Sequence, residues 1–491
     1  MYQPKFHQLS FEKFYLPFGG KLDPENRWVK LAESIPWHVA EKLYSKNFPS
    51  KRGAPALTVR MALGSLIIKE KLGLSDMETV AQLRENPYLQ YFIGLERYQH
   101  EAPFDASMLT HFRKRLKHAD VTVLQEELLK QHLEQERRKP KEDDDEDGGS
   151  GNNGRLIVDA TCAPADIAYP TDIGLLNEAR EKTEKIIDEL CSMHPEGIGK
   201  PRTYRKKARK AFLAVSMKKR LPKRVLQRGI RTQLQYIGRN LKHIGDLSEQ
   251  VSLSVLSARL YRDLLVVSEL YRQHLEMYRS GSKSISDRLV SINQPHVRPI
   301  VRGKAAARTE FGMKLSISVV AGMSMLERMS WNAYNEGGDL VRDIERYRER
   351  YGHYPESVHA DKIYRTLANR MWCKERGIRL SGVPLGRPPK DAGKNRARRR
   401  QIREDEGIRN AVEGKFGQAK RRYSLNRVMA RLAESSQTVV SIVFLVMNLE
   451  RLLAAPFLRL FAWLFSAPAE GEIISLWSSS RAAYQYCSAM V

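Results

Sequence analysis

At 491 residues with 42% apolar side chains, the chain can form roughly two to four domains with ordinary cores, which excludes a fibrous or wholly disordered protein. The formal net charge of +26 and the isoelectric point near 9.8 exceed what solubility needs, so they indicate an anionic polymer as partner, nucleic acid before membrane. The most apolar stretch, residues 441–465, is interrupted by charged residues and a proline, which predicts a buried core helix and no membrane span.

The start of the chain has no apolar run followed by a small-residue cleavage site, so no secretory signal is expected and the predicted location is the cytoplasm. The four cysteines lie far apart, without a C-x-x-C pair and without histidines at metal-ligand spacing. Neither a disulfide scaffold nor a structural zinc site is predicted.

An N-terminal helical domain is predicted for residues 1–136, with a compact helical unit at residues 51–118. Apolar residues recur at helical spacing from Leu57 to Ile67. The serine and the glutamate of SDMETV form a capping box, which predicts the start of the next helix. The sequence therefore predicts several short helices that pack on one another.

The last helix of this unit is basic. It is expected to begin in DASMLTHFRKRL, with Ser107 as its N-cap, and it carries Arg113 and Lys114 near its end. Three short helices with a basic last one permit a helix-turn-helix type of DNA-binding domain, with these two residues as DNA contacts. A small helical bundle with solvated basic side chains fits the pattern equally well.

Residues 137–155 combine an acidic block with glycine, serine and asparagine. Such a segment cannot bury apolar surface, so it predicts a flexible linker and a domain boundary. A second domain is predicted for residues 156–467, and residues 468–491 are expected to form a C-terminal tail.

The second domain alternates strand and helix patterns, which predicts an α/β fold with a mixed sheet and helices packed on it. The stretch RLIVDATCAP predicts a buried strand that ends at Asp159, and a large helical insertion is expected at about 177–292. The elements expected after the insertion are strands at 310–322 and 325–331, a helix ending at Gly352, a short strand ending at Asp361, a helix at 363–376, a strand in IRLSG, and helices from about 401 to 465.

The insertion contains a basic track. Residues 200–231 hold fourteen Lys or Arg, including Arg205, Lys206 and Lys207, and no Asp or Glu. A charge run is usually a solvated face, but this one includes Tyr204 and lacks any acid to balance it. The pattern favours a contact surface for the phosphate backbone of a nucleic acid.

Three acids stand out by their placement: Asp159 and Asp361 at the carboxyl ends of strands, and Glu413 on a later helix. Ligands gather at the carboxyl ends of strands in open α/β sheets, so these side chains can meet. Carboxylates without histidines suit Mg²⁺ or Mn²⁺, and two such ions on a basic protein indicate phosphodiester chemistry. Alternatively, the aspartates are turn or cap residues, and Glu413 pairs with Lys415 or with Arg409 and Lys420.

The chain resembles bacterial insertion-sequence transposases of the DDE type, whose catalytic domain has an RNase H-like fold. The resemblance rests on LIVDAT at the first strand, NEGGDL, HADKIYRT, and RNAVEGKFGQAKRRYSLNRVMARL near the end. The stretch from RGAPALTVRMALGSL to FDASMLTHFRKRL is similar to the helical N-terminal domain of these enzymes. The several motifs stand in the family's order and together cover most of the chain.

The resemblance implies that Asp159, Asp361 and Glu413 are catalytic and bind two Mg²⁺, with Mn²⁺ as a substitute. One branch of the family has a Tyr, Arg, Glu, Lys signature, and its last three members match Arg409, Glu413 and Lys420. Arg409 and Lys420 would contact DNA phosphates. The tyrosine position holds Glu406, which makes Glu406 a rival for the third acid.

The resemblance also implies that the protein binds the terminal inverted repeats of its element and target DNA at the nucleoid, cuts strands and transfers them. A homodimer is expected, with no membrane partner. One alternative is a catalytically inactive or domesticated DNA-binding protein derived from a transposase, and another is a stand-alone nuclease of the same fold.

Overall fold

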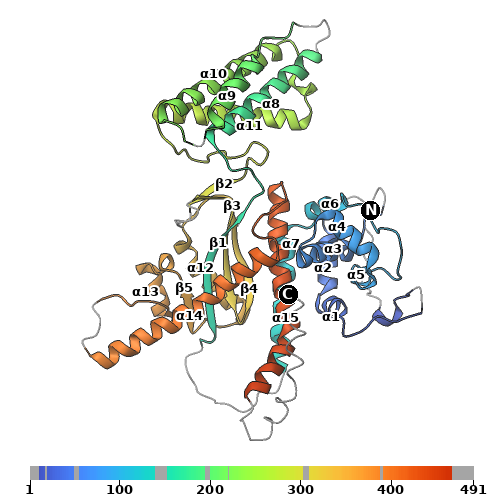
Figure 1. Cartoon of the computed structure of the whole chain (residues 1–491). Helices are drawn as coiled ribbons and strands as arrows, with labels where there is room; N and C mark the ends of the chain where they lie inside the picture. The colour runs from blue at the N-terminus through green and yellow to red at the C-terminus, as the bar shows by residue number, and fades with distance from the viewer. Residues whose placement is uncertain are drawn as a thin grey trace, which may run out of the picture.

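The computed structural model describes residues 10–16, 19–48, 55–138, 152–193, 199–218, 220–301, 309–386 and 391–466. It has three parts: a layer of N-terminal helices, a sheet with helices on both faces, and a helical insertion beyond one end of the sheet (Figure 1). Most of the predicted linker, and the whole of the predicted tail at 468–491, lie outside the described residues.

The N-terminal part is helical, as predicted. The side chain of Ser75 accepts a hydrogen bond from the Glu78 amide at 3.1 Å, so the serine half of the predicted capping box is confirmed. The Glu78 carboxylate accepts from the Gln82 side chain at 3.3 Å. The basic helix begins directly after Ser107, but the Ser107 side chain makes no capping bond. Its helices are α1 (Arg27–Ser34), α2 (Trp37–Ser45), α3 (Val59–Leu72), α4 (Asp76–Glu85), α5 (Pro87–Phe92), α6 (Met108–Arg115) and α7 (His118–Arg138).

The sheet is mixed, which confirms an α/β fold. Its strand order is β2-β3-β1-β5-β6, and β4 pairs with β3. The central strand β1 runs antiparallel to β3 and parallel to β5. The strands are β1 (Arg155–Pro164), β2 (Arg298–Val301), β3 (Thr309–Val320), β4 (Met323–Ser330), β5 (Ser357–Ala360) and β6 (Arg379–Leu380).

The observed strands differ from the predicted ones in the end of β1 and in the presence of β2. The prediction that the first strand ends at Asp159 is wrong, because β1 continues to Pro164 by pairing with β3. The four residues of β2 were not predicted; β2 pairs with the start of β3. The β3–β4 hairpin was predicted, and Ala321 and Gly322 form its turn with φ of 49° and 82°. Left-handed residues match the twist of the strands that such turns connect.

Helices cover both faces of the sheet. The strand residues alternate in the direction of their side chains, so Leu156 and Val158 pack with α12 and α13 while Ile157 packs with α14 and α15. The helix α12 ends before Gly352, as predicted, and α14 begins nine residues before the expected position 401. These helices are α12 (Leu340–Tyr351), α13 (Leu367–Glu375), α14 (Ala392–Arg422) and α15 (Ala433–Ser466).

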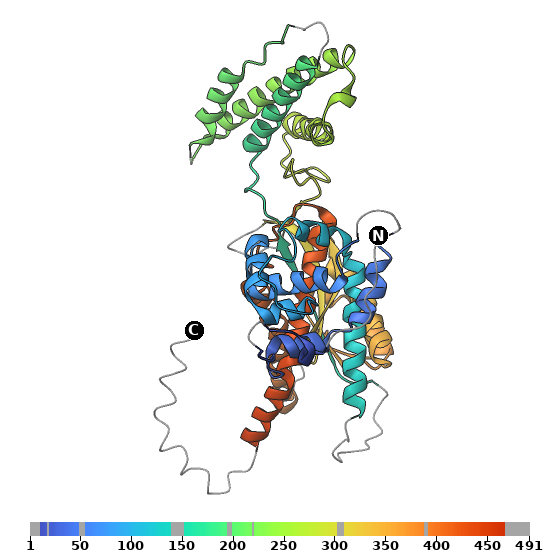
Figure 2. The same cartoon turned by 90° about the vertical axis from the view of Figure 1, so that its right-hand side faces the viewer.

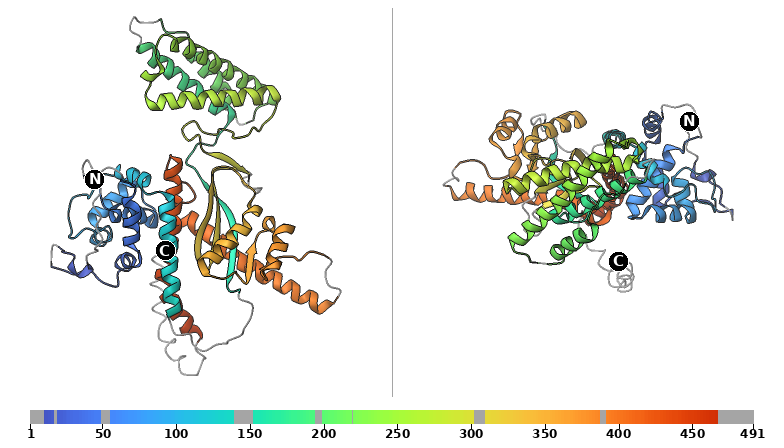
Figure 3. Two further views of the ribbon diagram at one scale, coloured as in Figure 1. Left: turned by 180° about the vertical axis from the view of Figure 1, so that it is seen from behind. Right: turned by 90° about the horizontal axis from the view of Figure 1, so that it is seen from above.

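The helix α15 lies between the sheet and the N-terminal helices, side by side with α7 (Figure 3). The Asn448 side chain binds both the backbone N–H and the carbonyl of Ser324 at 2.8 Å, and Gln125 of α7 donates to the Ser441 carbonyl at 3.0 Å. The segment Ala433–Ala454 of α15 is long and apolar enough to cross a membrane, but 67% of its most apolar window is buried inside the protein. This packing identifies α15 as a core helix.

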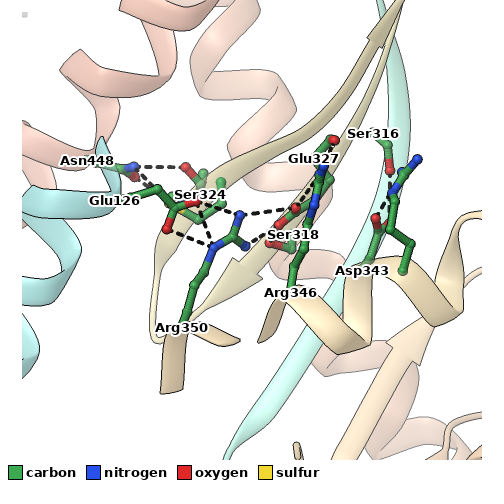
Figure 4. A network of polar contacts seen from close by, with 11 residues as sticks. Glu126, Ser316, Ser318, Ser324, Glu327, Asp343, Arg346, Arg350 and Asn448 are labelled. Carbon is green, nitrogen blue, oxygen red and sulfur yellow. Dashed lines mark hydrogen bonds and ion pairs between the residues drawn. The ribbon is translucent and has the colours of Figure 1, made fainter. Parts of the chain in front are cut away.

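A buried ionic network joins the N-terminal layer to the sheet (Figure 4). Glu327 of β4 is fully buried and binds Arg350 of α12 at 2.5 Å and Arg346 at 3.2 Å. Ser318 donates to the same carboxylate at 2.5 Å. Arg350 also binds Glu126 of α7 at 2.8 Å, so one guanidinium connects three elements.

The described residues of the insertion form a bundle of four α-helices, which stands apart from the sheet in two perpendicular views (Figures 1 and 2). It starts at Asp172, five residues before the predicted position, because the Thr171 side chain accepts from the Gly174 amide at 3.2 Å and caps the helix. The helices are α8 (Asp172–Ser192), α9 (Arg205–Ser216), α10 (Lys223–Ser248) and α11 (Ala258–Ser280).

Candidate active site

Asp159 and Asp361 lie next to each other at the edge where β5 stops. The last parallel pair joins Val158 of β1 to Ala360 of β5, so the following residue on each strand is one of these aspartates. The side chains of Ile157 and Asp159 point to the same face of the sheet, which is the face covered by α14. The predicted meeting of the two strand-borne acids is therefore present in the fold.

The buried Asp405 of α14 ties this helix to the sheet through an ion pair with Arg379. Asp405 accepts two hydrogen bonds from Arg379 of β6 at 2.9 Å and lies 3.6 Å from Nδ1 of the buried His359 on β5. Burial lowers the pKa of His359, so the imidazole is neutral at pH 7. Because helix positions four apart share a face, Arg409 and Glu413 follow one and two turns later on the same side.

Arg409 bridges two of the three acids. Its guanidinium lies 3.8 Å from Oδ2 of Asp159 and 3.4 Å from Oε1 of Glu413. Glu413 is 58% exposed, whereas Asp159 is 15% exposed. The ion pair of Glu413 with Arg409, expected as an alternative to catalysis, is present, so one guanidinium lies close to both acids.

These side chains line a cleft of about 1040 Å³ that is open to solvent. Both Arg409 and Lys420 lie on its wall, on the same face of α14 as Glu413. Glu406, the rival acid, is exposed two turns earlier and does not line the cleft. The charged residues of the wall are Asp159, Lys314, Glu336, Asp361, Arg409, Glu413 and Lys420.

Glu336 and Lys314 are cleft residues that the sequence reading did not single out. Nζ of Lys314 lies 2.6 Å from Oε1 of Glu336 and donates to the Tyr334 carbonyl at 2.7 Å. Both side chains are largely buried, at 13% and 18% exposed. The only sequence signal for Glu336 as a site residue was indirect, because it stands in the motif NEGGDL. Its approach to Asp159 depends on how two loops pack.

Those two loops are the 3-10 turns η3 (Glu336–Gly338) and η4 (Lys362–Tyr364), which follow β4 and β5. Asn369 donates to the carbonyls of Gly337 at 2.7 Å and of Tyr364 at 2.8 Å, which holds the turns together. A Cβ atom at position 337 would lie 2.5 Å from the Ile363 carbonyl oxygen, so only glycine permits this packing. Glu336 and Asp361 thereby reach the same cleft.

The pKa of Asp159 is raised from 3.8 to about 6. Burial is the main cause; the Ala160 amide and Arg409 lower the pKa, and the nearby carboxylates of Glu336 and Asp361 raise it. Folding therefore strengthens proton binding at Asp159. The stability that this group contributes is full below pH 4 and is lost as the pH rises through about 6.

Asp159→Asn is accordingly expected to stabilise the protein without metal. Replacing a buried charge by a neutral amide should raise the free energy of unfolding at pH 8 by about 2 kcal/mol, with little change at pH 3.5, where the aspartate is protonated. Urea unfolding in EDTA at both pH values measures this. An equal effect at both values would contradict the raised pKa.

The acids of the wall fit a divalent cation by their chemistry, because their carboxylates offer oxygen donors and a cation would offset the cost of ionising the buried Asp159. Across the described ranges, no three Asp, Glu, His or Cys side chains lie close enough to hold one ion together. Two acids of the wall are already paired with protein cations, since Arg409 binds Glu413 and Lys314 binds Glu336. A cation in the cleft would compete with these two protein cations.

The other predicted DNA contacts lie away from the cleft. Arg113 of α6 binds Asp76 of α4 through two hydrogen bonds of 2.9 and 2.6 Å and is 10% exposed, whereas Lys114 is exposed. In the insertion, Lys206 and Lys207 are exposed. Their roles remain predictions.

In the insertion, the structure corrects the prediction made for the basic track of residues 200–231. The expectation that no acid balances the basic track is wrong for Lys200 and Arg205, because both pair with Asp188 of α8. The balancing acid comes from another helix, which a count along residues 200–231 does not reveal.

Two protein-family models match the chain. One, described as a transposase DDE domain, matches residues 358–450, and the other, described as a transposase domain (DUF772), matches residues 17–115. The first contains Asp361, Arg409 and Glu413, and neither contains Asp159. The assignment of Asp159 therefore depends on its position beside Asp361 in the fold.

A similar protein is the uncharacterized protein ORF8 in the nfe locus of Rhizobium meliloti. It is 36% identical over 158 residues, which are 32% of this chain and 71% of the relative. No solved structure matches the chain. Together, the two family matches, this relative and the acids at the edge of a mixed sheet show that the chain belongs to the DDE transposases of bacterial insertion sequences.

Proposed function

We propose that the protein binds the terminal inverted repeats of its own element, cuts the DNA there and joins the freed 3′-hydroxyl to target DNA. The observation that supports this proposal is the cleft whose wall includes Asp159, Asp361 and Glu413 together with Arg409 and Lys420. An RNase H-like catalytic domain is supported by the strand arrangement, with β3 and β4 antiparallel on one side of β1 and β5 and β6 parallel on the other.

The three acids would hold Mg²⁺ or Mn²⁺, which when bound activates the attacking oxygen and stabilises the leaving one. Asp159, with a pKa of about 6, is ionised at neutral pH and available as a ligand. Arg409 and Lys420 on the wall suit phosphate groups of the DNA, because both carry hydrogen-bond donors and positive charge. Lys314 adds a third cation, so the cleft can accept an anionic backbone despite its acids.

The net charge of +26 supports DNA as the partner and the nucleoid as the place of action. A homodimer is proposed from the family alone. The predicted DNA contacts Lys114, Lys206 and Lys207 are exposed, as such contacts must be. Arg113 and Arg205 would first have to leave their ion pairs with Asp76 and Asp188.

The test is an incubation of purified protein with a duplex that carries the inverted repeat flanking its gene, a target plasmid and Mg²⁺ or Mn²⁺. The expected result is nicking at the repeat end followed by joined products on a sequencing gel. Binding without cutting would support an inactive or domesticated DNA-binding protein. Cutting without joining would support a stand-alone nuclease, and either result would reject the proposal.

A further inference from the structure

The helical insertion is a structural unit with its own core. Two hydrophobic clusters inside the bundle consist only of residues between Ile173 and Ile292. Two chain segments connect the bundle to the sheet, one after β1 and one before β2 (Figure 1). Its surface can therefore differ in charge from the rest of the protein without affecting the packing of the sheet.

The charges of the bundle are divided between its helices. The whole of α9, and α10 up to Gly245, contain no Asp or Glu. The acids of the bundle are concentrated on α8 and α11, where they bind nearby basic residues. The acids with such ion pairs include Glu181, Glu184, Asp188, Asp263, Glu269 and Glu276.

The basic residues of α9 and α10 are mostly left without an acidic partner. Among the ion pairs between described residues, Arg205 is the only member from these two helices. By contrast, Lys182 and Arg262 of the acidic helices both bind the buried Asp263. A surface that keeps many cations without acids repels itself, so it suits an anionic partner that supplies the missing charge.

The exposed cations follow the helical repeat. On α10, Arg224, Arg228 and Arg231 are exposed and spaced four and three residues apart, so they form one stripe about 10 Å long. On α9, Lys206 and Lys210 are exposed one turn apart. The two helices contact each other, and the Gln233 side chain donates to the Ala208 carbonyl at 3.2 Å. The stripes therefore run on neighbouring helices.

The apolar faces of both helices are already used. Ala208 and Val215 of α9, and Ile230, Leu234 and Ile237 of α10, are buried in the bundle. Among the described residues of the two helices, the exposed large apolar side chains are Leu213 and Val225, one on each helix. They are fewer than the exposed cations and do not form the continuous apolar face that insertion into a lipid surface needs, which argues against a membrane as the partner. Arginine and lysine on a rigid helix pair instead suit duplex phosphates, which on each strand follow one another about every 3.4 Å along the helix axis.

We propose that the exposed basic stripes of α9 and α10 bind the phosphate backbone of duplex DNA independently of base sequence. This inference rests on the proposed function, because it adds a second contact region for the DNA that the cleft would process. The segment after β1 is anchored beside the sheet by Asp166, which binds Arg427 at 2.5 Å and whose carbonyl accepts from Gln294 at 2.9 Å. The bundle thus extends from the strand that carries Asp159.

The test compares two triple variants that remove equal charge. R224Q/R228Q/R231Q removes the α10 stripe, and R259Q/R272Q/R279Q removes three exposed arginines from α11. Fluorescence anisotropy with a random duplex and with a repeat-containing duplex, from 50 to 300 mM salt, gives the salt dependence of binding. Circular dichroism checks that both variants fold.

The α10 variant is expected to lower the slope of log K against log salt by about 2 to 3, since each lost phosphate contact contributes about 0.9. The loss should be equal for both duplexes, and the α11 variant should change the slope by less than about 1. Equal slopes for the two variants, a loss on the repeat duplex alone, or stripe-dependent binding to anionic vesicles instead of DNA would overturn the inference. If the inference is overturned in this way, the wild-type protein from the same preparations is tested for cutting at the repeat. Cutting would show that the proposed function survives without the inference.

Discussion

Glu413→Gln is expected to reduce strand cleavage by about 10³-fold, while Glu406→Gln leaves it within about twofold. If Glu413 holds a metal ion, as proposed, its loss removes several kcal/mol of transition-state stabilisation, and each 1.36 kcal/mol changes a rate tenfold. The two glutamates share a face of α14, but only Glu413 lies in the cleft beside Arg409. Single-turnover cleavage of a labelled repeat duplex with Mn²⁺ measures the effect.

The two variants are a matched pair, because both residues are exposed and each substitution keeps the shape of the side chain. Neither should change the free energy of unfolding by more than about 0.5 kcal/mol. DNA affinity without metal should also be retained by both. An inactive Glu406→Gln together with an active Glu413→Gln would transfer the third role to Glu406 and would require α14 to move along the sheet.

Glu327→Ala is expected to lower the free energy of unfolding by about 3 to 5 kcal/mol. It leaves Arg346 and the largely buried Arg350 without their shared carboxylate, and an uncompensated buried charge is costly. Arg350 keeps its bond to Glu126, so the lower end of the range is expected. Urea unfolding followed by tryptophan fluorescence at pH 7.5 measures the change.

Glu349→Ala is the control for this variant, because Glu349 is an exposed acid on the same helix, α12. Its effect should stay within about 0.5 kcal/mol. Because the network connects β4 and α12 to α7, Glu327→Ala should also make the N-terminal helices easier to cleave with trypsin (Figure 4). A loss below about 1 kcal/mol would mean that the packing of α15 alone holds the two layers together.

Local patterns were sufficient for most elements of the fold. The period-two alternation of β3, the capping serine of α4 and the glycine after α12 are each signals within a few residues, and the structure has these elements where they were expected. The end of β1 could not be predicted in this way. Residues 160–164 are held in a strand by β3, which lies about 150 positions later, so long-range pairing decides this boundary.

The candidate site shows the same division. The sequence by itself determined the types of the three acids, the basic character of the chain and the resemblance to a family. Only the tertiary structure placed Glu336 and Lys314 in the cleft, left Glu406 outside it, and paired Arg113 and Arg205 with acids from other helices. The physical reason is that helix and strand periods act over a few residues, whereas burial and charge pairing depend on segments that meet only when the chain folds.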